Sequence, residues 1–139
     1  MRLVPNHPFP PYSYVPGKFP HPVSDPQGHA FGTTESPAVN IAPGDWIRST
    51  PYLFGIDLFN HGYYWESHEA WEAVWHAVGR TGRQADFLKS LIKLAAAMVK
   101  AREGRRDGVI RHGQRATELL HSVLRSGTST DMMGLSLSY

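Results

Sequence analysis

Residues 59–76 contain the side chains of this sequence that are best suited to chemistry. The segment holds three glutamates and three tryptophans together with His68 and His76. At 100° per residue on a helix, one stripe carries Trp65, His68, Glu69, Glu72 and His76. His68, Glu72 and His76 follow one another at four-residue spacing, so each lies above the next. Such a stripe offers several hydrogen-bonding or metal-binding groups on one face.

The spacing of His68, Glu72 and His76 predicts a divalent metal site, because imidazole and carboxylate are common metal ligands. His68 and Glu69 begin like the H-E-x-x-H motif of zinc proteases, but Glu72 stands where the second histidine is required, which excludes that reading. The residues that could complete a metal site come from the N-terminal segment: His21, Asp25 and His29. The alternative is a solvated helix face whose charges pair along the surface.

We expect the glutamates and histidine near the start of this helix to act in catalysis or binding: Glu66, His68, Glu69 and Glu72. The side chains expected to line the ligand site are Trp65, Trp75, His76, Lys89, Lys93 and His112. Trp65 and Trp75 favour a partly enclosed site, since large indoles are seldom left bare around a row of charges.

The lysines lie on the next expected helix, which would run antiparallel to the first. That arrangement puts Lys89 level with Glu72 and Lys93 level with Glu69. Carboxylates beside desolvated ammonium groups have altered pKa values, as acid–base sites do. Ordinary salt bridges between the two helices are the alternative. His112 falls on the apolar face of a later helix, where it is either a hydrogen-bonded core histidine or a further member of the site.

The elements that position these residues follow from the distribution of proline and glycine. All eleven prolines lie at or before Pro51, which predicts an extended arm over residues 1–50. The aromatic side chains of the arm favour packing on the helical body, although such segments are often disordered. Apolar periodicity predicts helices over 53–59, 64–78, 86–102 and about 107–125, with Asp107 as an N-cap. We expect an all-α fold, a small antiparallel bundle over residues 51–126, and a loose tail over 127–139.

Composition excludes several classes of protein. The chain has no cysteine, no signal-peptide core and no long apolar run, which predicts a cytoplasmic protein without a membrane span. Nucleophile and phosphate-loop motifs are missing. Nucleic acid is not an expected partner, because the arginines of the second half lack interleaved aromatic residues. Residues 1–79 carry three basic and seven acidic side chains, and residues 80–139 carry eleven and five, which favours contact between oppositely charged faces and a homo-oligomer.

A longer pattern runs through the same residues. Phe59-Asn60, Gly62, Tyr64, Glu66, His68-Glu69, Trp71-Glu72 and Trp75 form it, and it continues into residues 88–97. This segment resembles the F-N-x-G-x-Y-x-E-x-H-E-x-W-E signature of a prokaryotic family, the domain of unknown function 309. The resemblance covers about residues 53–124 and implies a compact all-α fold with no established activity. Lys93 departs from the glutamine associated with that position in the family.

The sequence therefore predicts a cytoplasmic helical protein with a Glu/His/Trp-lined site for a small polar ligand or a divalent metal ion, and it leaves open whether the protein is an enzyme. The alternative is a non-catalytic helical module for protein interaction or self-association.

Overall fold

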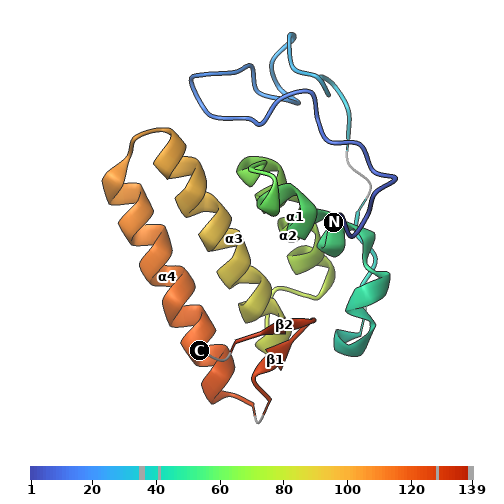
Figure 1. Ribbon diagram of the computed structural model, residues 1–139, viewed down its shortest axis with the longest axis vertical. Coiled ribbons are helices and arrows are strands. Elements are labelled where there is room, and N and C mark those ends of the chain that lie inside the picture. The colour runs from blue at the N-terminus through green and yellow to red at the C-terminus, as the bar shows by residue number, and fades with distance from the viewer. Residues whose placement is uncertain (35–36, 41, 128, 138–139) are drawn as a thin grey trace.

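The computed structural model describes residues 1–34, 37–40, 42–127 and 129–137. The described part of the N-terminal arm contains no helix or strand. The described residues after it form a short 3-10 helix, four α-helices and two short strands (Figure 1). In order these are η1 (Pro43–Arg48), α1 (Thr50–Asn60), α2 (Tyr64–Ala77), α3 (Arg83–Arg102), α4 (Arg106–Arg125), β1 (Asp131–Met132) and β2 (Leu135–Ser136).

Local signals set the bounds of α1. The Ser49 side chain accepts a hydrogen bond from the Tyr52 backbone N–H at 3.3 Å, which caps the helix, and Pro51 occupies the first turn. After Asn60, Gly62 adopts a φ of +86°, a conformation that costs glycine little. The chain therefore turns at Gly62 directly into α2.

The predicted start of α3 is three residues too late. The helix begins at Arg83 rather than Asp86, directly after Gly82 with its φ of +99°. Arg83 is held there because its guanidinium donates hydrogen bonds to the carbonyl oxygens of Val123 and Ser129. Asp107 is likewise not the N-cap of α4; Arg105 occupies that position and Asp107 lies in the first turn. A carboxylate in that turn still complements the helix dipole.

The segment after α4, which we expected to be a loose tail, contains a short β-hairpin. β1 and β2 pair antiparallel, with Met132 opposite Leu135. Met133 and Gly134 form the two-residue turn between them, with φ values of +48° and +82°, as in a type I′ hairpin. The hairpin packs against the helices because Met132 and Met133 are buried and the Tyr52 hydroxyl donates a 2.8 Å hydrogen bond to the Met133 carbonyl.

Extensive helix packing joins neighbours in the sequence: α1 packs on α2, α2 on α3, and α3 on α4 (Figure 1). The buried core is formed by Tyr52, Trp71, Val74, Phe87, Leu88, Leu91, Ile92, Ala95, Val123, Met132 and Met133. Trp71 fits close to α1 because Gly55 has no side chain, and its indole N–H donates to the Tyr52 carbonyl at 3.2 Å. Burial of these apolar side chains is the main force that holds the helices together.

Two buried carboxylates contact the arm. Asp57 on α1, 2% exposed, accepts hydrogen bonds from the backbone N–H groups of Leu3 and Val4, each at 2.8 Å. Glu66 on α2, 7% exposed, accepts one from the Tyr14 N–H at 2.7 Å. The described part of the arm lies beside the α1 and α2 end of the molecule (Figure 1). The division into arm, bundle and tail stays a prediction.

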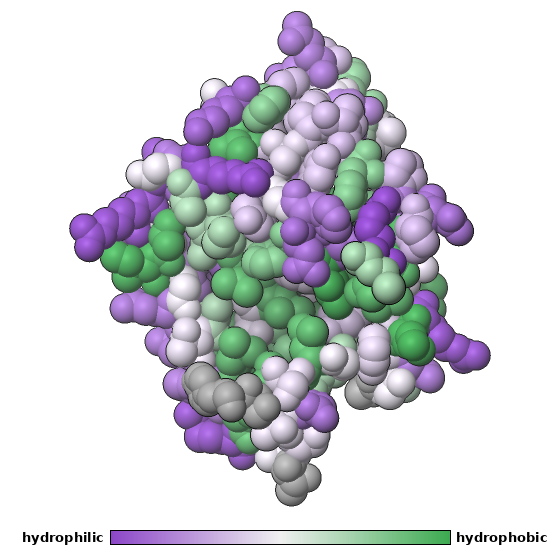
Figure 2. Space-filling view, viewed as in Figure 1, coloured by the Kyte–Doolittle hydropathy of each residue, from purple (hydrophilic) through white to green (hydrophobic). Residues whose placement is uncertain are grey.

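The predicted all-α helical fold is confirmed, with the small hairpin as its only described sheet. Figure 2 shows hydrophilic side chains along the edge formed by α4, at the left of the view, and hydrophobic ones over the middle of this face. None of the helices in the described residues combines the length and apolar character needed to cross a membrane.

Candidate functional site

The polar stripe on α2 brings three side chains to one point. Nδ1 of His68 lies 3.3 Å from Oε1 of Glu69 and 3.6 Å from Oε2 of Glu72. One ligand atom from each residue can be chosen so that all three lie within 4.8 Å of one another. All three residues are half-buried. Within the described parts of the chain, this is the one group of histidine and carboxylate side chains with the spacing that a metal ion needs.

His76 extends this row but faces another partner. Its Nε2 lies 3.8 Å from Oε1 of Glu72, while its Nδ1 accepts a 2.8 Å hydrogen bond from the Arg80 guanidinium. Since Nδ1 accepts, Nε2 carries the proton when the ring is neutral. A metal bound at Nε2 would require that proton to move to Nδ1, which would break the hydrogen bond from Arg80. The structure therefore groups Glu69, rather than His76, with His68 and Glu72.

The lysines of α3 face the stripe without forming the interhelical salt bridges considered as an alternative. No ion pair within 4.0 Å joins Lys89 or Lys93 to a carboxylate among the residues described. The Lys89 ammonium instead lies 4.1 Å from the ring centroid of Trp75, in a cation–π contact. Partial burial, and next the charge of Lys89, lower the pKa of Lys93, while the nearby Glu72 carboxylate acts in the opposite direction.

His112 approaches the same place from α4. Partial burial lowers the pKa of His112, followed by the charges of Lys93 and other neighbouring cations, among which is His68 when protonated. The half-buried groups of three helices thus form an electrostatic cluster: His68 and Glu72 from α2, Lys93 from α3, and His112 from α4.

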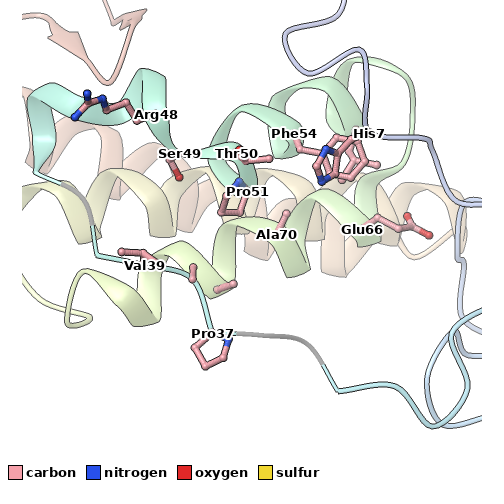
Figure 3. A pocket seen from close by; sticks show the side chains of 13 residues that line it. His7, Pro37, Val39, Arg48, Ser49, Thr50, Pro51, Phe54, Glu66 and Ala70 are labelled. Atoms are coloured by element: carbon pink, nitrogen blue, oxygen red, sulfur yellow. The ribbon is translucent and has the colours of Figure 1, made fainter.

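Glu66 is separate from this cluster. Its carboxylate turns to the arm, where Oε1 accepts the Tyr14 N–H and Oε2 is buried without a hydrogen-bond partner. Burial raises the pKa of Glu66, although the hydrogen bond from Tyr14 opposes the shift. Glu66 also lines an apolar pocket of about 570 Å³ between α1, α2 and residues 37–39, in which His7 lies against Phe54 (Figure 3).

A second pocket, of about 460 Å³, adjoins the stripe. It is lined by Pro37, Ala38, Glu69, Glu72, Ala73, His76 and Ala77. The alanines of α2 that line this pocket and the first one are half-buried. Their small side chains leave room beside the two glutamates, so a small molecule could approach the carboxylates from solvent.

The arm histidines do not complete a metal site among the described residues. Nδ1 of His21 accepts from the backbone N–H groups of Val23 and Ser24, both at 3.2 Å. The ring of His21 packs edge-on against Trp65 and Tyr14, with centroids 5.3 and 5.1 Å apart. Trp65 is therefore enclosed by the arm.

Sequence reasoning missed Tyr14 and Asp57 as residues that hold the arm. Tyr14 makes its contact through the backbone N–H, which almost every residue type has, so the sequence contains no signal for it. For Asp57 the available signal is an acidic residue within the short apolar helix, flanked by Ile56 and Leu58, where a lone charge calls for a buried partner.

Residues 52–112 match the model of a known family, described as Domain of unknown function (DUF309). This segment is similar to the DUF309 family. The family predicted from the signature is thereby confirmed, and the match extends from Tyr52 in α1 to His112 in α4. The stripe and the facing lysines all lie within the DUF309 segment, whereas the arm and the hairpin lie outside it. No curated protein and no solved structure matches the chain.

Proposed function

We propose that the protein binds a divalent metal ion through His68, Glu69 and Glu72. The observation that carries this proposal is the convergence of one ligand atom from each residue within 4.8 Å. A single helix supplies all three, because His68 and Glu72 are one turn apart and Glu69 lies between them on the same stripe. A ligand set from one rigid helix needs little reorganisation on binding.

The donor set fits a first-row divalent ion. One imidazole and two carboxylates suit zinc, manganese or iron(II), whereas calcium prefers oxygen ligands alone. Three protein ligands leave at least one coordination position open for water or a small polar ligand. A metal in such a position lowers the pKa of its bound water and polarises a substrate oxygen, which is the basis on which this site would support catalysis.

The competing explanation is a set of ion pairs in which a protonated His68 lies between two carboxylates. Ion pairs near the protein surface contribute roughly 0–1 kcal/mol to stability. The two explanations predict different effects of added metal on the stability of the protein. An ion-pair cluster gains nothing from added zinc, whereas a metal site gives a saturable shift of the melting temperature that grows with ion concentration.

The test compares the wild type with His68→Ala and Glu72→Gln. Zinc and manganese affinities are measured by isothermal titration calorimetry on protein stripped with a chelator, and bound metal is counted after desalting. We expect one ion per chain and at least about tenfold weaker binding in both variants, since each loses a ligand. His121→Ala is the matched control, because His121 is an exposed histidine on α4.

Equal affinity in the wild type and both variants, or no binding to the wild type, would reject the metal site. The same samples test the alternative of a self-association module. Light scattering gives the mass of each variant, and loss of an oligomer without any change in metal binding would assign the stripe to a subunit interface.

A further inference from the structure

A group of cations lies where α3 passes between α2 and α4. Lys89 and Lys93 are one turn apart on α3 and both are half-buried. Arg111 and Arg115 of α4 are close enough to Lys93 to lower its pKa. His112, also half-buried, lies between them in sequence. The cations therefore come from α3 and α4, two helices that pack against each other.

The two lysines lack the carboxylate partners that other cations of these helices have. Lys100 lies 2.8 Å from Oε2 of Glu103, and Arg115 lies 3.1 Å from Oε2 of Glu118. Neither Lys89 nor Lys93 has an ion pair or a hydrogen bond to a carboxylate in the described ranges. Glu72 is the acidic group that acts on Lys93, and it is already shared by His68 and His76.

The contact of Lys89 with Trp75 and the charge of Glu72 offset only part of the repulsion between these cations. Lys89 and Lys93 repel each other at four-residue spacing, and partial burial weakens the screening by water. A bound oxyanion would reverse both effects, because it neutralises the ammonium groups and accepts their hydrogen bonds. Burial lowers the pKa of His112, which favours the neutral ring, and a neutral imidazole has one N–H to donate to such an anion.

We propose that Lys89, Lys93 and His112 bind the oxyanion group, carboxylate or phosphate, of a small ligand beside the metal site on α2. The proposed oxyanion site uses only the cations of α3 and α4 and does not require a bound metal. The second contact, of the same ligand with the ion held by His68, Glu69 and Glu72, rests on the proposed function. The site would thus select anionic rather than neutral small molecules.

The test uses inorganic phosphate and acetate as probes, on full-length metal-free protein at constant ionic strength. Affinity is measured by calorimetry and by the rise in melting temperature. We expect saturable binding of at least one probe to the wild type and about tenfold weaker binding in Lys93→Gln and Lys89→Gln, because each loses a charge-assisted hydrogen bond. Lys93→Arg keeps the charge and should retain most of the affinity. Stronger binding of phosphate than acetate would identify a phosphate-bearing ligand, and the reverse a carboxylate.

Arg106→Gln controls for net charge, because Arg106 is an exposed cation at the start of α4. If Arg106→Gln weakens binding as much as Lys93→Gln does, the probe responds to the net charge of the protein and the proposed oxyanion site is wrong. The proposal is also wrong if neither probe binds the wild type. Failure of the metal site gives another result. His68→Ala would then bind zinc like the wild type, while the lysine variants still lose phosphate or acetate.

Discussion

The carboxylate of Glu66 accepts a hydrogen bond from the backbone N–H of Tyr14, at 2.7 Å and across 52 positions of the sequence. This contact ties α2 to the arm at a point where the carboxylate is almost fully buried. Glu66 therefore forms a hydrogen bond to the arm, whereas His68, Glu69 and Glu72 contact one another within α2. Its position within the signature does not by itself indicate chemistry.

Replacing Glu66 with alanine should destabilise the protein by about 1–3 kcal/mol, because the Tyr14 N–H loses its acceptor. Glu66→Gln keeps an acceptor oxygen and should remain within about 1 kcal/mol of the wild type. Urea denaturation measures both, with Glu118→Ala, an exposed glutamate, as control. Equal losses in the alanine and glutamine variants would mean that the hydrogen bond does not contribute.

Asp57 should hold the first residues of the arm. Its carboxylate accepts two backbone N–H groups and lies 3.8 Å from Nε of Arg2. Asp57→Ala should cost about 2–4 kcal/mol, because hydrogen bonds to a buried carboxylate are among the stronger ones. Amide hydrogen exchange gives the local result: the Leu3 and Val4 amides should lose protection in the variant. Unchanged protection of both would show that other contacts hold this segment.

Gly55 and Gly113 provide a matched pair of substitutions. A Cβ at Gly55 would overlap the Trp71 indole, whereas a Cβ at Gly113 meets no atom within 4 Å. Gly55→Ala should therefore destabilise by about 1–3 kcal/mol despite the better helix propensity of alanine. Gly113→Ala should stabilise by about 0.5–1 kcal/mol. Thermal melts of both variants check this, and a gain in stability at position 55 would refute the close packing of α1 on α2.

His112 should make stability depend on pH. Its pKa in the folded protein is below the ordinary value of 6.5, so the unfolded chain binds its proton more readily. The stability due to neutral His112 is fully present above pH 6.5 and is lost as the pH falls below that value. Relative to His112→Gln, the wild type should become less stable between pH 7.5 and 5.5 in urea titrations.

Lys93→Gln should reduce this pH effect, because the charge of Lys93 is the second cause of the shift after burial. The effect is measured by comparing the pH dependence of stability of Lys93→Gln with that of the double variant Lys93→Gln/His112→Gln. A difference between wild type and His112→Gln that is constant with pH, or that grows in favour of the wild type on acidification, would contradict the expected direction.

Periodicity predicted the helices because it reports a local property, the apolar side of each helix. Apolar spacing and glycine positions gave α1 to α4 within a few residues, and the stripe on α2 followed from the same geometry. Contacts that are distant in sequence were not accessible in this way. The burial of Glu66 depends on the backbone of Tyr14, and periodicity along α2 carries no information about the arm.

The hairpin was missed for a different reason. A two-residue type I′ turn is normally signalled by Asn-Gly or Asp-Gly, and here Met133 takes the first position with a φ of +48°. Methionine rarely adopts that conformation, and packing against the core holds it there, since Met133 is buried and its carbonyl accepts from Tyr52. The deciding interaction again comes from a distant helix.

Helix α1 is contacted from both sides of the sequence. Asp57 accepts the N–H groups of Leu3 and Val4, and Tyr52 donates to Met133. If either terminal segment opened, a polar side chain of α1 would lose its hydrogen-bond partner. The two segments and α1 should therefore exchange their amide protons together, as one cooperative unfolding unit that extends beyond both ends of the segment matched by the family.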